Sequence, residues 1–292
     1  KVLNSSNYIL GKNVKKFEND FSDFIGTKYS IGVANGTDAI EIALKAIDIS
    51  KGDEVISVSH TALASIAGII LAGAKPVLVD VNKDDFTIKV EDIKKNINKK
   101  TKAILVVHIY GQSANMDAII KLSKKYNIKV IEDVSQAHGG KFKNKFLGSF
   151  GDLSTFSFYP TKNLGAIGDA GAICTNNLKF AEKIKKIREY GWNKKRLADI
   201  NGRNSRLDEI QAAILRIKLK YLKADIKKRQ NIASIYKNTI KNKNIIHPKI
   251  FKLEDHAFHL YVIKTKKRND LLKFLRDNKI VCGIHYPKPI HL

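Results

Sequence analysis

Short apolar runs rich in β-branched residues alternate with helical periodicity through the first 175 residues of this 292-residue chain. Most of the runs are continuously apolar, which is typical of strands covered on both faces. This alternation predicts a layered α/β domain with a largely parallel sheet. The expected strands occupy 29–34, 54–59, 75–80, 103–110, 128–134, 154–159 and 171–175.

Helices are expected between the first five strands, most clearly at 37–47 and 115–126, where apolar residues recur at i, i+3, i+4 and i+7. The last two strands follow each other through a loop without a helix, which predicts a mixed sheet.

The character of the sequence changes after residue 177. A helix is expected to stop at Gly191, and 207–242 reads as one long helical stretch or as two pieces. A strand at 259–265 and a helix at 269–278 complete the pattern. We therefore expect a large domain over 1–220 and a small domain over 221–292. The chain starts without methionine and stops in mid-pattern, so we expect the small domain to be truncated.

Composition narrows the class of protein. No apolar run approaches the roughly 18 residues needed to span a membrane, and the N-terminus lacks a signal-peptide pattern. The two cysteines, Cys174 and Cys282, have no metal-site spacing. We expect a cytoplasmic protein without a membrane partner.

The formal charge of +25 could indicate a nucleic-acid partner. The lysines, however, are spread along the whole chain in pairs, and arginines of the kind that read DNA bases do not cluster. A lysine-rich composition alone explains the charge. We expect no nucleic-acid partner, while salt-sensitive binding to unrelated DNA would favour one.

Three stretches carry chemistry. In "VANGTDAI", a strand ends at Asn35 and a helix begins at once, so free N–H groups and the helix dipole can bind a phosphate. Gly36 allows close approach to the backbone, and the Thr37 hydroxyl can bond a phosphate or cap the helix. A plain helix cap that binds nothing is the alternative.

The second stretch, "IKVIEDVSQAHGG", delivers Glu132 and Asp133 to the carboxyl end of a strand, where ligands collect in α/β sheets. An aspartate held there can keep a ring nitrogen protonated, and Gln136 and His138 could bond ring substituents. A helix-capping aspartate with a solvated histidine is the alternative. The spacing does not fit zinc, so no metal is expected.

The third stretch, "STFSFYPTKNLGAIGDAGAICT", places Lys162 in a loop that follows an aromatic strand. A lysine amine attacks carbonyl groups only when part of it is unprotonated, which requires desolvation or a neighbouring charge. Ser157 should point away from Phe156 and Phe158 and could contact a phosphate. An exposed loop lysine is the alternative reading.

Together, a phosphate cradle, a strand aspartate and a loop lysine, in that order, are what pyridoxal 5′-phosphate requires. The lysine would form the imine, the aspartate would hold the pyridinium positive, and the helix N-terminus would anchor the phosphate.

The motifs "GVANGTDAIEIALKA", "GDEVISVSHT", "VHIYGQ", "EDVSQAHGG", "FSFYPTKNLGAIGDAGAI", "GRNSRLDEIQAAIL" and "GIHYPKPIH" resemble the DegT/DnrJ/StrS family of sugar aminotransferases. The resemblance runs from about residue 7 to the end of the chain. It implies an aspartate-aminotransferase type of fold: a large α/β/α domain with a mixed, roughly seven-stranded sheet and a small α+β domain. It also implies a homodimer with active sites at the interface.

The resemblance assigns roles residue by residue. Lys162 would be the Schiff-base lysine and Asp133 the pyridinium partner, with Gln136 near the ring hydroxyl. The phosphate would be held by Gly36, Thr37 and Ser157, and by Asn204 reaching across the dimer. His138, His285 and Tyr286 are candidates for contact with the sugar nucleotide.

One departure stands out. Many members of the family carry an aromatic residue that stacks on the cofactor ring, at the position where this chain has Ala62. We therefore expect another residue to cover the ring in this protein. A minority of members replace the lysine with histidine and act as dehydratases, and the lysine here favours transamination. The resemblance implies amino transfer, with glutamate as donor, to a dTDP-3-keto-6-deoxyhexose. A UDP-linked keto-sugar and a silent, regulatory cofactor-binding relative are the alternatives.

Overall fold

The computed structural model describes residues 2–292, and its centre is a seven-stranded mixed sheet in the order β1-β9-β8-β5-β4-β2-β3. All seven expected strands are present: β1 (Tyr29–Val33), β2 (Glu54–Val58), β3 (Lys75–Val79), β4 (Thr101–Val107), β5 (Lys129–Asp133), β8 (Leu153–Ser157) and β9 (Gly171–Thr175). A separate hairpin pairs β6 (Lys141–Phe142) with β7 (Lys145–Phe146). β9 runs antiparallel to both of its neighbours, which confirms the mixed sheet.

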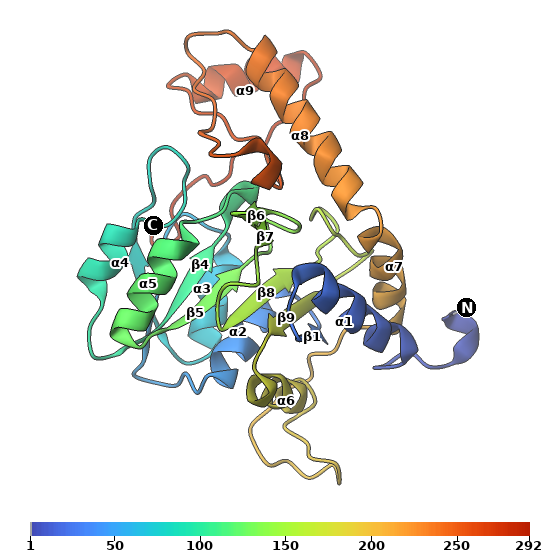
Figure 1. The fold of residues 1–292 in the computed structure, drawn as a ribbon. Helices are drawn as coiled ribbons and strands as arrows, with labels where there is room; N and C mark the ends of the chain where they lie inside the picture. The colour runs from blue at the N-terminus through green and yellow to red at the C-terminus, as the bar shows by residue number, and fades with distance from the viewer. Residues whose placement is uncertain (1) are drawn as a thin grey trace.

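Helices cover both faces of this sheet (Figure 1). Their bounds are α1 (Lys12–Ile25), α2 (Gly36–Ala46), α3 (Leu63–Leu71), α4 (Val90–Asn96), α5 (Met116–Tyr126), α6 (Leu178–Ile187), α7 (Glu209–Leu219), α8 (Leu222–Thr239) and α9 (Arg268–Asp277). Short 3₁₀ turns occur at Leu3–Ser5, Ile109–Gly111 and Leu253–Asp255.

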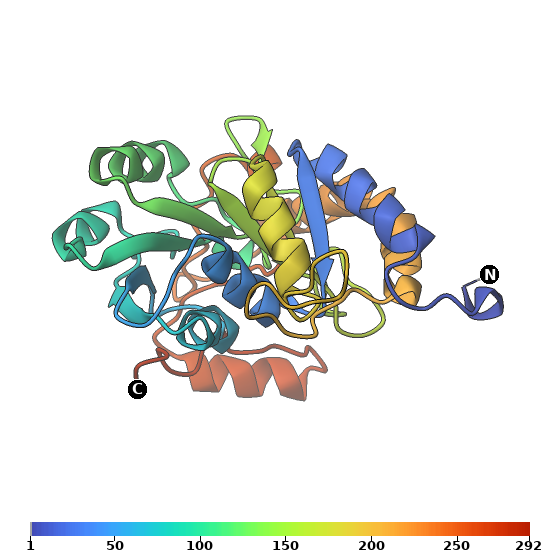
Figure 2. The same cartoon turned by 90° about the horizontal axis from the view of Figure 1, so that it is seen from below.

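The side chains of β4 show how one strand serves two cores. Ala103 and Leu105 join the apolar cluster under α2, α3 and α6, whereas Ile104 and Val106 join the cluster under α4 and α5. Successive strand residues point to opposite faces, so a continuously apolar strand is buried on both. The result is the expected three-layer α/β/α arrangement, seen from below in Figure 2.

An aromatic cluster joins α1 to β8. Phe21 packs edge-on against Phe156 and Phe158, with ring centroids 4.9 and 5.2 Å apart, and all three side chains are fully buried. Ser157, between the two strand phenylalanines, faces the opposite side of the sheet and lines a pocket, as its place in the strand predicts.

Two expectations about the C-terminal part need correction. The helix expected to reach Gly191 ends at Ile187, and an irregular segment follows it. The strand expected at 259–265 is wrong for the part of the chain that the structure describes: one isolated bridge joins Ile246 to Lys264. The apolar run instead bonds the segment that follows β4, because Leu260 N–H donates to the Tyr110 carbonyl at 3.3 Å, and Ala257 N–H, just before the run, donates to the Gly111 carbonyl at 3.0 Å.

The long helical stretch forms two helices, α7 and α8. α8 leads away from the sheet towards α9 (Figure 1), yet its first turns still pack into the aromatic core through Leu222 and Ile226. The division of the chain at 220/221 therefore stays a prediction. Among residues 2–292, no helix has both the length and the apolar character needed to cross a bilayer.

Candidate active site

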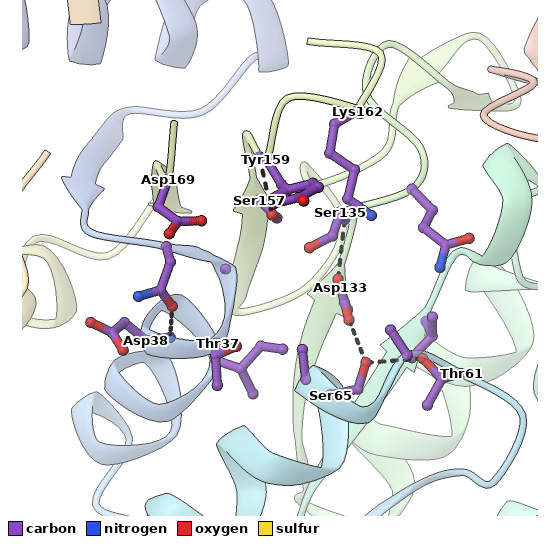
Figure 3. A pocket seen from close by; sticks show the side chains of 17 residues that line it. Thr37, Asp38, Thr61, Ser65, Asp133, Ser135, Ser157, Tyr159, Lys162 and Asp169 are labelled. Atoms are coloured by element: carbon purple, nitrogen blue, oxygen red, sulfur yellow. Dashed lines mark hydrogen bonds between the residues drawn. The ribbon is translucent and has the colours of Figure 1, made fainter. Parts of the chain in front are cut away.

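A pocket of about 490 Å³ lies at the carboxyl ends of the central strands. Figure 3 shows side chains from several separate segments converging on it. The lining residues are Asn35, Gly36, Thr37, Asp38, Ile40, Thr61, Ala62, Ala64, Ser65, Val107, Asp133, Ser135, Gln136, Ser157, Tyr159, Lys162 and Asp169. Ligands of open α/β sheets collect at this end of the strands.

The N-terminus of α2 forms one wall. The Asn35 side chain accepts a hydrogen bond from Asp38 N–H at 2.8 Å, so Asn35, and not Thr37, caps the helix. The hydroxyl of Thr37 is thereby left for the pocket. The first N–H groups of a helix have no partner within it, and they sit at the positive end of the helix dipole. This wall therefore suits an anionic group.

Gly36 is required by close packing at this wall. A Cβ atom at Gly36 would lie 2.5 Å from the Ser157 Cβ atom, which is closer than such atoms approach in proteins. The absence of a side chain thus lets the end of β8 reach the start of α2. The same contact brings the Ser157 hydroxyl beside the helix N-terminus.

Asp38 also lines this wall, and its charge would oppose an anion. Its carboxylate accepts a hydrogen bond from the Ser205 hydroxyl at 2.7 Å and lies 3.3 Å from the Arg203 guanidinium. Arg203 also pairs with Glu41. These partners offset the carboxylate charge, so the field of the helix N-terminus remains available to a ligand.

Asp133 ends β5 and is 5% exposed. Its Oδ2 atom accepts a hydrogen bond from the Ser65 hydroxyl at 2.8 Å, and its Oδ1 atom accepts one from Ser135 N–H at 3.1 Å. Ser65 is in turn bonded to Thr61 at 2.9 Å. Figure 3 follows this chain of bonds, which fixes the orientation of the carboxylate.

Lys162 approaches Asp133 from the loop that follows β8, and both side chains line the same pocket (Figure 3). The backbone N–H of Lys162 donates to the Tyr159 carbonyl at 2.8 Å, which closes the turn. Burial lowers the pKa of Lys162, and the Asp133 carboxylate partly opposes this. A lysine with a lowered pKa is more often present as the free amine, which is the nucleophilic form.

Gln136 is held at both ends of its amide. Its Oε1 atom accepts a hydrogen bond from Tyr110 N–H at 2.9 Å, and its Nε2 atom donates to the Tyr286 hydroxyl at 2.8 Å. Tyr110 adopts φ +59°, a left-handed conformation that is uncommon for a bulky residue. The Tyr110 hydroxyl donates to the His285 carbonyl, so one network links the pocket to the C-terminal segment.

Several predicted residues lie elsewhere. His138 is 1% exposed and packs against Phe156 and Phe158, away from the pocket wall. His285 and Tyr286 contact the network of Gln136 but do not line the pocket. Glu132 points to the opposite face, where its carboxylate accepts hydrogen bonds from Gly148 and Gly151 N–H.

Asn204 lines a second, adjoining pocket of about 450 Å³ together with Arg206, Asp208 and Gln211. Asp169 lines both pockets, so the two are neighbours. Asn204 does not line the pocket of Lys162 within one chain. Its predicted reach across a dimer stays a prediction.

The pocket wall at Ala62 is built of small side chains, Thr61, Ala62 and Ala64. Tyr159 is the one aromatic residue among those lining the pocket, and it is 52% exposed. The sequence pattern did not single out Ser65, which lies four residues after the end of the motif "GDEVISVSHT". No cluster of three or more His, Cys, Asp or Glu side chains within residues 2–292 could hold a metal ion.

The model of the DegT/DnrJ/EryC1/StrS aminotransferase family matches residues 1–292. A dTDP-3-amino-3,6-dideoxy-α-D-galactopyranose transaminase of Aneurinibacillus thermoaerophilus is 48% identical, with 100% of this chain and 80% of that protein covered. A pleiotropic regulatory protein of Geobacillus stearothermophilus is 42% identical, with 100% and 79% covered. Relatives named for UDP-linked sugars match at 36% and 37% identity.

Solved structures agree with the fold. DesV of S. venezuelae, in complex with a ketimine intermediate, has a TM-score of 0.95 at 37% identity, and 100% of this chain and 79% of that chain are covered. NtdA of Bacillus subtilis, with bound cofactor PMP, has a TM-score of 0.92 at 34% identity, with 99% and 68% covered. These comparisons confirm the expected fold and enzyme class. The chain belongs to the DegT/DnrJ/EryC1/StrS aminotransferase family.

Proposed function

We propose that this protein uses pyridoxal 5′-phosphate to move an amino group from glutamate to a nucleotide-linked keto-sugar. The observation that carries the proposal is the meeting of Lys162 and Asp133 in one pocket, beside the N-terminus of α2. Each residue alone has an ordinary structural explanation. Together they supply the two groups that this cofactor needs, a primary amine and a carboxylate.

The residues present fit the cofactor. The close approach at Gly36, where a Cβ atom would collide with Ser157, leaves backbone N–H groups and two hydroxyls to hold a phosphate. The Asp133 carboxylate, oriented by Ser65 and Ser135, is placed to bind a protonated ring nitrogen. The Nε2 atom of Gln136 carries a second N–H besides the one given to Tyr286, and it can donate this to a ring hydroxyl.

The bound cofactor would act as an electron sink that stabilises the carbanion formed at the substrate carbon. Asp133 would maintain that capacity by keeping a proton on the ring nitrogen. Lys162 would hold the cofactor through its side-chain amine. When free, the same amine would move a proton between the donor α-carbon and the cofactor, acting as a general base and then as an acid. A lowered pKa suits that role, since the amine must be unprotonated to accept the proton.

The best acceptor is a dTDP-3-keto-6-deoxyhexose, which the A. thermoaerophilus relative supports through its name and identity. A UDP-linked keto-sugar is the second choice, favoured by more distant relatives. The proposed enzyme is a homodimer in which Asn204 of each subunit serves the other subunit's site.

A regulatory role is the second candidate function, because a relative of 42% identity carries that description. The intact pair of Lys162 and Asp133 argues for turnover, since a protein that only binds the cofactor does not need a base poised for proton transfer. The two functions differ in whether the amino group reaches a sugar.

The experiment follows the absorbance of purified protein with pyridoxal 5′-phosphate, before and after L-glutamate is added. A shift from the imine band to the pyridoxamine band identifies the first half-reaction. Supplying dTDP- and UDP-linked 3-keto-sugars to the aminated form then identifies the acceptor by return of the first band. If the protein binds the cofactor but its absorbance band does not shift with any amino donor, the proposal is contradicted and a regulatory role is favoured.

A further inference from the structure

Every polar group of Tyr110 is bonded to a different segment of the chain. Its backbone N–H donates to the Gln136 Oε1 atom at 2.9 Å, and its backbone carbonyl accepts from Leu260 N–H at 3.3 Å. Its hydroxyl donates to the His285 carbonyl and lies 2.7 Å from the Nε2 atom of His60. One residue shortly after β4 thus joins the pocket to two segments of the C-terminal part.

The direction of the bonds at the Tyr110 hydroxyl is fixed. A phenol carries one proton, and the His285 carbonyl can only accept, so that proton belongs to the bond with His285. The Nε2 atom of His60 must then be the donor to the Tyr110 oxygen. Burial lowers the pKa of His60, and the Asp80 charge partly opposes this, so the ring is neutral at pH 7 with its one N–H on Nε2. His60 therefore holds the Tyr110 hydroxyl in the orientation that donates to His285.

Aromatic packing fixes the ring of Tyr110 as well. The His60 ring centroid lies 5.9 Å from that of Tyr110, 5.7 Å from that of Phe86 and 6.0 Å from that of Tyr286. Tyr110 and Phe86 both adopt left-handed backbone conformations, with φ of +59° and +62°, which are uncommon for bulky side chains. Such conformations persist only where surrounding contacts enforce them. The packing of these rings therefore holds Tyr110 in a conformation that a free loop would avoid.

The segment 285–290, here called the rim segment, is bonded beside the pocket at three points. Its first residue accepts from the Tyr110 hydroxyl. The Tyr286 hydroxyl accepts from the Nε2 atom of Gln136 at 2.8 Å, and the N–H of the last residue donates to the Ser59 carbonyl at 3.0 Å. Because Gln136 lines the pocket and is bonded to Tyr286, the rim segment forms the border of the pocket at Gln136.

The size of the two substrates decides which of them needs this border. The proposed phosphate site at Gly36 and the proposed ring-hydroxyl site at Gln136 lie on opposite sides of the aldehyde carbon of the cofactor. A substrate that reacts at this carbon therefore extends away from the phosphate and past Gln136. Glutamate is small enough to lie within a pocket of about 490 Å³, whereas a nucleotide-linked sugar is several times larger and must extend across the border.

We propose that Tyr110 is a positioning residue for the sugar-nucleotide acceptor: its hydroxyl, oriented by His60, docks the rim segment onto Gln136 and so completes the border over which the acceptor lies. The inference rests on the proposed function. Tyr110 reaches the reaction through the rim segment, and its hydroxyl rather than its ring carries this role. Glutamate, which stays inside the pocket, does not depend on it.

The test compares Tyr110→Phe with Tyr261→Phe. Each substitution removes one hydroxyl and keeps the ring. The Tyr261 hydroxyl is a matched control, because it is also bonded to a histidine nitrogen, Nδ1 of His247, at 2.7 Å. His247 in turn bonds the Ile240 carbonyl at the end of α8 rather than a residue of the pocket. Two further variants change the partner of Tyr110: His60→Leu removes the donor, and His60→Gln keeps a side-chain N–H.

The first readout is amide hydrogen exchange of the cofactor-free protein, measured by mass spectrometry on the peptide that contains Ile290. The N–H of Ile290 is protected by its bond to the Ser59 carbonyl while the rim segment stays docked. We expect this exchange to be about tenfold faster in Tyr110→Phe, because the lost hydrogen bond favours the undocked segment by about that factor. Tyr261→Phe should exchange at the unaltered rate.

The second readout separates the two substrates in the loaded enzyme. Tyr110→Phe should lower kcat/KM for the keto-sugar nucleotide about tenfold and leave kcat/KM for glutamate unchanged. His60→Leu should give the same pattern with a smaller fall. His60→Gln should restore part of it, because a side-chain N–H again donates to Tyr110. A residue with only a structural role would affect both substrates alike.

Unchanged exchange in Tyr110→Phe, an equal rise in Tyr261→Phe, or an equal fall in kcat/KM for both substrates would overturn the inference. If the unaltered protein shows no absorbance shift with glutamate, the proposed function fails instead, and the exchange comparison still decides whether Tyr110 docks the rim segment. If Tyr110→Phe does not fold, the His60 variants decide by the same readouts. Recovery in His60→Gln relative to His60→Leu supports the inference, and equal behaviour of the two contradicts it.

Discussion

The Ser65 hydroxyl, in the first turn of α3, donates a 2.8 Å hydrogen bond to the Asp133 carboxylate at the end of β5. Ser65 and Asp133 are 68 residues apart in sequence, so this one hydrogen bond joins two distant segments inside the pocket. Both residues are nearly inaccessible to solvent, so the bond is not in competition with water. The carboxylate is oriented before any ligand enters.

Replacing Ser65 with alanine should therefore lower kcat/KM for transamination about tenfold, because one of the donors that orient Asp133 is lost. Affinity for pyridoxal 5′-phosphate should fall in the same variant, as measured by absorbance titration. Ser123→Ala is the matched control, since its hydroxyl bonds only the Ile120 carbonyl of its own helix. Equal loss in both variants would show that Ser65 has no special relation to the cofactor.

Gly36→Ala tests the cradle at α2. The added Cβ atom would meet Ser157 at 2.5 Å, so the end of β8 must move away from the helix N-terminus. We expect cofactor affinity to fall at least tenfold while the protein still folds. The control is Gly11→Ala, whose added atom would lie nearest to the exposed Asn7 side chain. Unchanged affinity in Gly36→Ala would exclude this wall as the phosphate site.

Glu209 links the start of α7 to the start of α1. Its carboxylate accepts hydrogen bonds from the backbone N–H groups of Asn13 and Val14 at 2.9 and 2.7 Å, and the residue is 2% exposed. Glu209→Gln should lower the free energy of unfolding by about 2 kcal/mol, because a charged acceptor is lost at buried donors. Urea unfolding measures this, with the exposed Glu91→Gln as control. A loss of unfolding free energy in Glu209→Gln that exceeds that in Glu91→Gln by less than a few tenths of a kcal/mol would contradict the prediction.

Two buried histidines, His138 and His256, and the half-buried His259 predict how stability depends on pH. Burial lowers the pKa values of His138, His256 and His259 to about 3 in the folded protein, whereas unfolded histidine titrates near 6.5. Below pH 6.5 the unfolded chain therefore binds protons that the folded chain does not. Stability should be constant above that pH and should fall by about 1 kcal/mol per histidine for each unit below it.

Thermal unfolding midpoints at pH 7.5 and 5.5 measure this effect. The His256→Phe variant should lose less stability over that interval than the unaltered protein does, since one of the three titrating groups is gone. A variant with an identical pH dependence would show that His256 is protonated when folded.

The seven strands could be located from the sequence because most of them are continuously apolar runs between turn residues. Strands that are buried on both faces carry few polar residues that would interrupt such a run. Lys162, Asp133, Gly36 and Ser157 could be predicted to share a site because strand ends of one sheet edge lie together. The shift of the cap from Thr37 to Asn35 could not be predicted, since both residue types cap helices well.

Other features depend on contacts between distant segments. The run at 259–265 is apolar enough for a strand, yet it forms only an isolated bridge between Lys264 and Ile246. The backbone N–H of Ala257, just before the run, instead donates to the Gly111 carbonyl. Ser65 reads as an ordinary helical serine until the helix is packed against β5. Burial of His138 likewise depends on α1, which brings Phe21 to the strand phenylalanines beside it.

The most direct test of the account is to identify the residue that is bonded to the cofactor. Protein loaded with pyridoxal 5′-phosphate is reduced with borohydride, digested and analysed by peptide mass spectrometry. The account predicts that the added mass lies on Lys162 and is absent from Lys162→Arg. Modification at another lysine in a protein that still transfers amino groups, or an unmodified Lys162, would contradict it.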